Sequence, residues 1–104
     1  MFINFGTEHL IIVSIFLAGL STNLFSQSGQ EIYETGCAVC HDAGIAGAPM
    51  IGNRAQWEVR LAKGYKMLVN NSYNGINGMP AKGLCADCTK EEISLAVQYM
   101  LDSI

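Results

Sequence analysis

The sequence predicts a small all-α domain built from about four helices, and three observations support this fold class. Apolar residues recur at helical spacing in four segments, the stretches between them are rich in Gly, Asn and Pro, and 104 residues allow only one domain. Half of the residues are hydrophobic and 14% are charged, with a formal net charge of −3. This composition excludes a disordered charged tail and leaves no basic stripe for a nucleic acid.

The first 26 residues are typical of an export signal. From Leu10 to Leu20 the chain is apolar and uncharged, over about half of the roughly 20 residues that a membrane-spanning helix needs. Ser26 is a small residue suited to the position before a cleavage site. We therefore expect residues 1–26 to be a signal peptide, residues 27–104 to be the mature domain, and the periplasm to be its compartment. The alternative is an N-terminal membrane anchor that is not cleaved.

The mature region begins with a predicted helix and a loop. From Ser28 to Gly36, Ile32 and Tyr33 recur among polar neighbours, which indicates a short amphipathic helix. Residues 42–52 contain several Gly and a Pro, so this stretch is predicted to be a loop.

Three more helices are predicted in the second half of the chain. One runs from Arg54 to Lys63 and ends at Gly64, and the next runs from about Tyr65 to Tyr73. The last helix begins at Thr89, which forms a capping box with the Glu three residues later. The residues expected to share a face in these helices are, in order, Trp57, Arg60 and Leu61; Leu68, Val69 and Ser72; and Ile93, Val97, Met100 and Leu101.

The four Cys form two Cys-x-x-Cys pairs, Cys37/Cys40 and Cys85/Cys88. Two such pairs can hold a zinc ion with four thiolates, so a structural zinc module is one alternative. Only the first pair is followed by His, in the sequence Cys37-Ala38-Val39-Cys40-His41. This is the attachment signature of c-type haem. An exported domain this short also needs a cofactor or crosslink for stability, and the sequence therefore predicts one covalently bound haem c.

The Cys-x-x-Cys-His spacing has a physical reason. On one helical turn Cys37 and Cys40 project from the same side, where both thiols can form thioethers with the two vinyl groups of the haem. The next residue, His41, then directs its imidazole at the iron.

The second iron ligand is sought among the methionines, because His41 is the only His after residue 26 and thioether sulfur is a common haem ligand. Met50 follows His41 too closely for the chain to pass around the ring. Met67 and Met100 fall in helical patterns and are expected to fill the core. Met79 lies in a loop rich in Gly, Asn and Pro, so we predict His41 and Met79 as the axial ligands. The alternative for Met79 is an ordinary surface position in a turn.

From about Gly29 to Met100 the chain resembles the bacterial class I cytochromes c, and within them it is similar to the cytochrome c5 family. The residues that carry the resemblance are Cys37-Ala38-Val39-Cys40-His41, Gly47-Ala48-Pro49, Trp57, Ala62-Lys63-Gly64, Asn74-Gly75, Gly78-Met79-Pro80 and Cys85-Ala86-Asp87-Cys88. The resemblance implies a small class I cytochrome c fold, with about four helices around one covalent haem. It also implies that the first and last helices cross, with Gly29, Tyr33 and Tyr99 at the contact.

A disulfide between Cys85 and Cys88 is a further implication of the resemblance. Independently, two thiols three residues apart in an oxidising compartment have little to keep them reduced. Such a bond would fix the segment after Met79. The competing interpretation is a redox-active dithiol like that of thioredoxin, but no βαβ pattern accompanies the pair.

Three residues are candidates for contacts around the haem. The Pro49 carbonyl is expected to accept a hydrogen bond from Nδ1 of His41, because ligating imidazoles usually have such a partner. Trp57 Nε1 and Arg60 are candidate donors to a haem propionate. For Trp57 the alternative is plain core packing, and for Arg60 it is a solvated helix face.

With His41 and Met79 both bound, the iron has no open position, so we expect electron transfer rather than catalysis. The predicted function is a periplasmic carrier of one electron between redox proteins, namely a respiratory donor and a terminal oxidase or reductase. The alternatives are a haem enzyme or gas sensor in which Met79 does not bind, and the zinc module. The lysines are few, Lys63, Lys66, Lys82 and Lys90, so we expect partner association to depend less on salt than it does for a strongly basic cytochrome.

Overall fold

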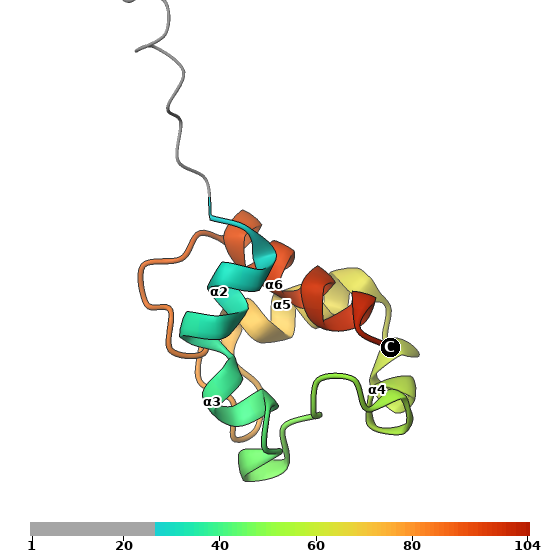
Figure 1. The fold of residues 1–104 in the computed structure, drawn as a ribbon. Coiled ribbons are helices and arrows are strands. Elements are labelled where there is room, and N and C mark those ends of the chain that lie inside the picture. Colours follow the sequence, from blue (N-terminus) through green and yellow to red (C-terminus); the bar gives the residue numbers. More distant parts are fainter. Residues whose placement is uncertain (1–26) are drawn as a thin grey trace, which may run out of the picture.

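A computed structural model describes residues 27–104. In this range the chain is helical and contains no named β-strand. The predicted signal peptide, residues 1–26, lies outside the described residues. The helices are α2 (Gly29–Gly36), α3 (Ala38–His41), α4 (Arg54–Leu61), α5 (Tyr65–Asn74) and α6 (Lys90–Asp102), with a short 3-10 turn, η1 (Ile45–Gly47). Figure 1 shows their arrangement. No helix in the described part is long and apolar enough to cross a membrane.

Local sequence signals explain where the helices begin and end. Ser28 and Thr89 each form a capping box, with Glu31 and Glu92 respectively, and the side chain of Asn53 caps α4. The predicted helix boundaries agree with the observed ones within about two residues. The predicted loop over residues 42–52 is irregular apart from η1.

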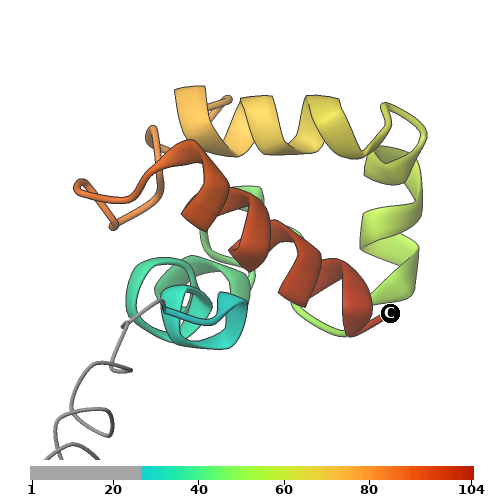
Figure 2. The same cartoon turned by 90° about the horizontal axis from the view of Figure 1, so that it is seen from above.

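The fold is held by α6, which lies between α2 and α5 (Figure 2). At the α2–α6 crossing, a Cβ on Gly29 would lie 2.2 Å from the backbone oxygen of Leu95, so the two helices approach as closely as only glycine permits. The Tyr33 and Tyr99 rings pack at the same crossing, with centroids 5.2 Å apart. The predicted contact through Gly29, Tyr33 and Tyr99 is therefore confirmed.

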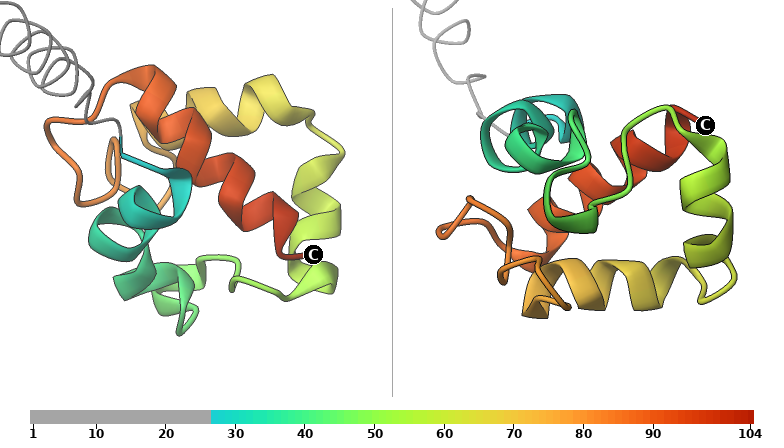
Figure 3. Two further views of the ribbon diagram at one scale, coloured as in Figure 1. Left: turned by 45° about the horizontal axis from the view of Figure 1, so that its top comes forward. Right: turned by 90° about the horizontal axis from the view of Figure 1, so that it is seen from below.

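The remaining helices complete a frame around the core. Figure 3 shows α4 and α5 following one another around α6, with the C-terminus next to α4. There the Ser103 hydroxyl accepts a hydrogen bond from the Gly52 N–H at 3.0 Å. The buried hydrophobic residues come from every long helix and from both Cys pairs: Ile32, Tyr33, Cys37, Trp57, Leu68, Val69, Cys88, Ile93, Ala96, Val97 and Met100.

Candidate haem site

Most of the predicted site residues line one cavity of about 440 Å³. This volume is in the range of cofactor-binding sites. The predicted residues that line it are Cys37, Cys40, His41, Trp57, Arg60 and Met79. Leu68, Val97 and Met100, which helical periodicity assigned only to the core, form part of its wall as well.

The two thiols of the first Cys pair are free and lie on one helical turn. The amide N–H groups of Cys40 and His41 both donate to the Cys37 carbonyl oxygen, at 3.2 and 3.0 Å, which closes the turn. Cys37 is buried and Cys40 half-buried. Burial, with a smaller contribution from Cys40, raises the pKa of the Cys37 thiol to about 11.

His41 is the only buried polar or charged residue within residues 27–104. Its Nδ1 is 2.8 Å from the carbonyl oxygen of Pro49, and its own backbone oxygen accepts from Ile51 N–H at 2.9 Å. The predicted orienting bond to Pro49 is therefore confirmed. Because a carbonyl oxygen can only accept, Nδ1 carries the proton and the lone pair is left on Nε2, as a metal ligand requires.

Trp57 stands beside the imidazole. The two rings are nearly parallel, with centroids 6.1 Å apart and planes 19° apart. The indole N–H donates to the Met50 carbonyl oxygen at 2.9 Å, and the side chain is buried. Its single donor is thus used within the chain, and a contact of Trp57 with a haem propionate stays a prediction.

Arg60 lies on the cavity wall and is half-buried. Its guanidinium donates to the carbonyl oxygens of Gln56 and Gly47, at 2.6 and 3.3 Å. These contacts use two of its five N–H groups and tie α4 to the loop over residues 42–52.

Met79 is presented by a tight turn. Ile76 and Met79 exchange two backbone hydrogen bonds of 3.0 and 2.8 Å, which places Asn77 and Gly78 at the tip. Gly75 precedes the turn with φ of +87°, and a Cβ there would lie 2.9 Å from the backbone nitrogen of Ala81. The half-buried Met79 side chain lines the same cavity as His41.

The tip of this turn meets η1 across the cavity. A Cβ on Gly78 would lie 3.3 Å from both Cβ and the backbone oxygen of Ala46, and both residues line the cavity. No local sequence signal predicts this contact, because it joins two loops that are distant in the sequence.

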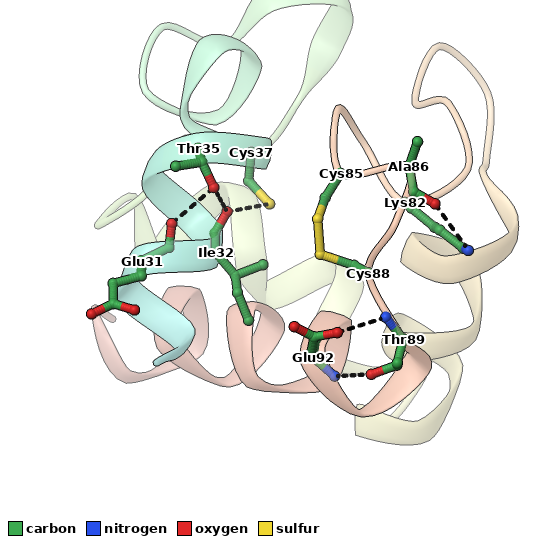
Figure 4. The surroundings of a disulfide bond; sticks show 10 residues. All are labelled: Glu31, Ile32, Thr35, Cys37, Lys82, Cys85, Ala86, Cys88, Thr89 and Glu92. Carbon is green, nitrogen blue, oxygen red and sulfur yellow. Dashed lines mark hydrogen bonds between the residues drawn. A yellow bond between two sulfur atoms is a disulfide. The ribbon is translucent and has the colours of Figure 1, made fainter. Parts of the chain in front are cut away.

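The second Cys pair is joined by a disulfide, with Cα atoms 5.4 Å apart (Figure 4). It lies beside the end of α2, where a Cβ on Gly36 would be 3.0 Å from Cys85 Cβ. The neighbouring Leu84 N–H donates to the Gly36 carbonyl oxygen at 2.9 Å. The disulfide leaves Cys37 and Cys40 as the free thiols within residues 27–104, so two of the four Cys that a four-thiolate zinc module would need are bonded to each other.

These residues fit a covalently attached haem. Two free thiols on one turn, an imidazole with Nε2 unprotonated and a thioether all border one cavity with largely apolar walls. Neutral imidazole and thioether are the donor pair found in electron-transfer haem centres.

Comparison with known proteins finds similarity to cytochromes. A family model described as cytochrome C oxidase, cbb3-type, subunit III matches residues 26–100. Cytochrome c5 of Ectopseudomonas mendocina is 40% identical over 77 residues, which cover 72% of this chain and 88% of the relative. Cytochrome c-555 of Chlorobaculum tepidum is 35% identical over 101 residues, covering 93% and 94% of the two chains.

Solved structures show the same likeness. A mono-haem ferrocytochrome c from Shewanella putrefaciens is 45% identical with a TM-score of 0.64, covering 74% of this chain and 95% of that chain. A chain from the electron transfer complex of nitrite reductase with cytochrome c is 31% identical with a TM-score of 0.69, covering 77% and 98%. The predicted all-α class is therefore confirmed.

Proposed function

The chain belongs to the small class I c-type cytochromes, as do cytochromes c5, c-555 and c-551, and we propose that it is a periplasmic one-electron carrier whose haem c is attached through Cys37 and Cys40 and ligated by His41 and Met79. The observation that carries this proposal is that all four side chains line one cavity. The haem, when bound, supplies an iron that takes up and returns one electron.

The loop over residues 42–52 determines the state of the proposed imidazole ligand. The Pro49 carbonyl holds the proton on Nδ1 of His41, so in the neutral ring the lone pair is on Nε2, and the ring cannot rotate without losing a bond in a buried position. The parallel Trp57 ring supports the imidazole from its side.

The turn over residues 76–79 provides the proposed thioether. Its two backbone bonds and the contact of Gly78 with Ala46 fix the turn against the opposite loop. With His41 and Met79 both as ligands, a bound haem iron would keep no open position, so we propose electron transfer without substrate chemistry at the metal.

A redox protein is the proposed partner, and a reductase or terminal oxidase is the proposed acceptor. This class of partner is supported by the similar chain whose structure was solved in an electron transfer complex of nitrite reductase with cytochrome c. Four exposed apolar side chains border the cavity and would contact such a partner: Val39, Ile45, Val59 and Leu84. Arg60 is the proposed propionate donor, through the N–H groups it does not use within the chain.

Expression with the export and haem-attachment machinery tests the proposal. A pyridine haemochrome spectrum should report about one covalent haem per chain, and the ferric protein should show the weak far-red band of a methionine–iron bond. Carbon monoxide should leave the spectrum of the reduced protein unchanged. Haem extracted by acid-acetone would refute the covalent attachment, and carbon monoxide binding would favour the haem enzyme or gas sensor.

A further inference from the structure

Tyr33 contacts both ends of the turn that carries the proposed haem attachment. Its carbonyl oxygen accepts a hydrogen bond from the Cys37 N–H at 2.9 Å, where the turn begins. Its side-chain hydroxyl donates to the Asp42 carboxylate, directly after His41. One residue of α2 therefore holds the start and the end of the segment from Cys37 to Asp42.

The Tyr33 side chain is itself held rigidly. It is 3% exposed, and its ring packs against Tyr99 of α6 at the helix crossing. A tyrosine this deeply buried needs a partner for its hydroxyl, and the exposed Asp42 is that partner. Burial, and then the bond to Asp42, raises the pKa of Tyr33, so the hydroxyl remains a donor at all ordinary pH values.

The opposite side of the turn is held by the loop over residues 42–52, through the bonds of His41 to Pro49 and Ile51. Those bonds orient the imidazole relative to the loop. They do not connect the turn to the α2–α6 crossing, where the two helices pack directly against each other. Two side-chain hydrogen bonds connect the turn to α2 in the described chain. One is the bond from the Tyr33 hydroxyl to Asp42, and the other runs from the Cys37 thiol to the Ile32 carbonyl oxygen at 4.0 Å and would be lost when that thiol forms a thioether.

We propose that Tyr33 is a positioning residue for the haem-binding turn: its hydroxyl bond to Asp42, opposite its backbone bond to Cys37, fixes the place from which α3 presents His41. The inference rests on the proposed function, because it assigns to His41 the role of iron ligand. It differs from the helix-crossing contact, which needs only the Tyr33 ring.

A pair of tyrosine variants in the haem-loaded protein tests the hydroxyl alone. Tyr33→Phe keeps the ring and removes the bond to Asp42, whereas Tyr99→Phe is the matched control, since the Tyr99 hydroxyl makes no hydrogen bond within residues 27–104. The amides of His41 and Gly44, which donate within the turn, should exchange with solvent about 10- to 100-fold faster in Tyr33→Phe than in the wild type. The amide of Val97 in α6 should change much less, because the effect is local.

Two further measurements separate positioning from a general loss of stability. Asp42→Ala, at an exposed position, should reproduce the faster exchange at Gly44, and Asp42→Asn, which keeps an acceptor oxygen, should restore part of the protection. The hyperfine-shifted resonances of the ferric protein should change in Tyr33→Phe and not in Tyr99→Phe.

Equal exchange rates in the two tyrosine variants, or unchanged protection of the turn in Tyr33→Phe, would overturn the inference. A uniform increase that includes Val97 would also overturn it, since the hydroxyl would then support the whole fold. Failure of the wild type to attach haem is a different result, which rejects the proposed function and is read from the haemochrome spectrum alone.

Discussion

The methionines within residues 27–104 occupy different environments, and the environment distinguishes the proposed ligand. Met100 is buried at 3% exposure, whereas Met67 is 48% exposed. Met50 is half-buried beside Gly44, and its carbonyl oxygen is engaged by Trp57. Met79 is the methionine that a loop turn presents to the cavity.

Replacement of Met79 by Leu should therefore remove the sulfur ligand while keeping a side chain of similar volume. We expect loss of the far-red band in the ferric protein, binding of carbon monoxide in the reduced protein, and a lower reduction potential, because thioether ligation raises it. Met67→Leu is the matched control and should leave all three properties unchanged, since Met67 is exposed and does not line the cavity. A Met79→Leu protein that keeps the far-red band would reject Met79 as the ligand.

Single residues could be predicted from the sequence where a local pattern determines their chemistry. The bond from His41 to Pro49 followed from the needs of a ligating imidazole and is confirmed. One side-chain assignment differs from the structure. Met67 was expected in the core and is exposed, whereas the contact of Trp57 with a propionate stays a prediction. Helical spacing shows which residues share a face, but the packing of the other helices decides which face is buried.

At the scale of elements, the α2–α6 crossing depends on a missing side chain at Gly29. A helical Gly→Ala change ordinarily stabilises a protein by about 0.5–1 kcal/mol. Here the added Cβ would lie 2.2 Å from a backbone oxygen of α6, so the helices must separate. We expect Gly29→Ala to lower the free energy of unfolding by about 1–3 kcal/mol, measured by denaturant titration. Gln30→Ala, one residue along the same helix and exposed, should have little effect, and equal stability of the two variants would contradict the close approach.

The disulfide closes a very short loop, so its contribution to stability should be small. In the chain-entropy model a crosslink between residues three apart contributes roughly 2 kcal/mol. We expect Cys85→Ala/Cys88→Ala to lower the free energy of unfolding by about this amount and to leave covalent haem attachment intact. Reduction of the wild-type disulfide is the control, because it keeps the buried sulfur of Cys88. A protein that no longer attaches haem after either treatment would show that the disulfide does more than fix this segment.

Most element boundaries could be predicted because capping residues and glycines mark them locally. Thr89 and Glu92 identified the start of α6, and Ser28 with Glu31 has the same spacing at the start of α2. The contact of Gly78 with Ala46 and the bond from Leu84 to Gly36 could not be predicted in this way. Each of these contacts joins two segments that are far apart in the sequence, and no periodic pattern of residues indicates that the segments meet. The contacts form only when the helices have packed.

At the scale of the whole molecule, the charge distribution around the cavity should govern partner association. Arg60 and Lys63 are the only cationic residues among those lining it, and four exposed apolar side chains border it. Apolar contacts are not screened by salt, whereas attraction between exposed charges is. We therefore expect the rate of association with a redox partner to fall only modestly between about 0.01 M and about 0.1 M salt, where the screening length falls from about 30 Å to about 10 Å. A steep fall in stopped-flow measurements would point to the lysines instead.

The cavity also shares part of its wall with the core, so the haem should determine whether the chain folds. Trp57, Leu68, Val97 and Met100 belong both to the buried core and to the cavity wall. Without haem these apolar side chains would face a cavity of about 440 Å³ instead of packed atoms, and the stability of an ordinary domain is only about 5–15 kcal/mol.

We expect residues 27–104 produced without haem to lose most of their helical circular dichroism and to show no cooperative denaturant transition, whereas the haem-loaded protein should show both. The Cys85–Cys88 disulfide should be formed in both samples, so that the crosslink is matched and only the haem differs. If the haem-free protein unfolded cooperatively with helix content close to that of the loaded protein, the helices would be shown to pack without the haem, and the core would have to lie mainly at the α2–α6 crossing.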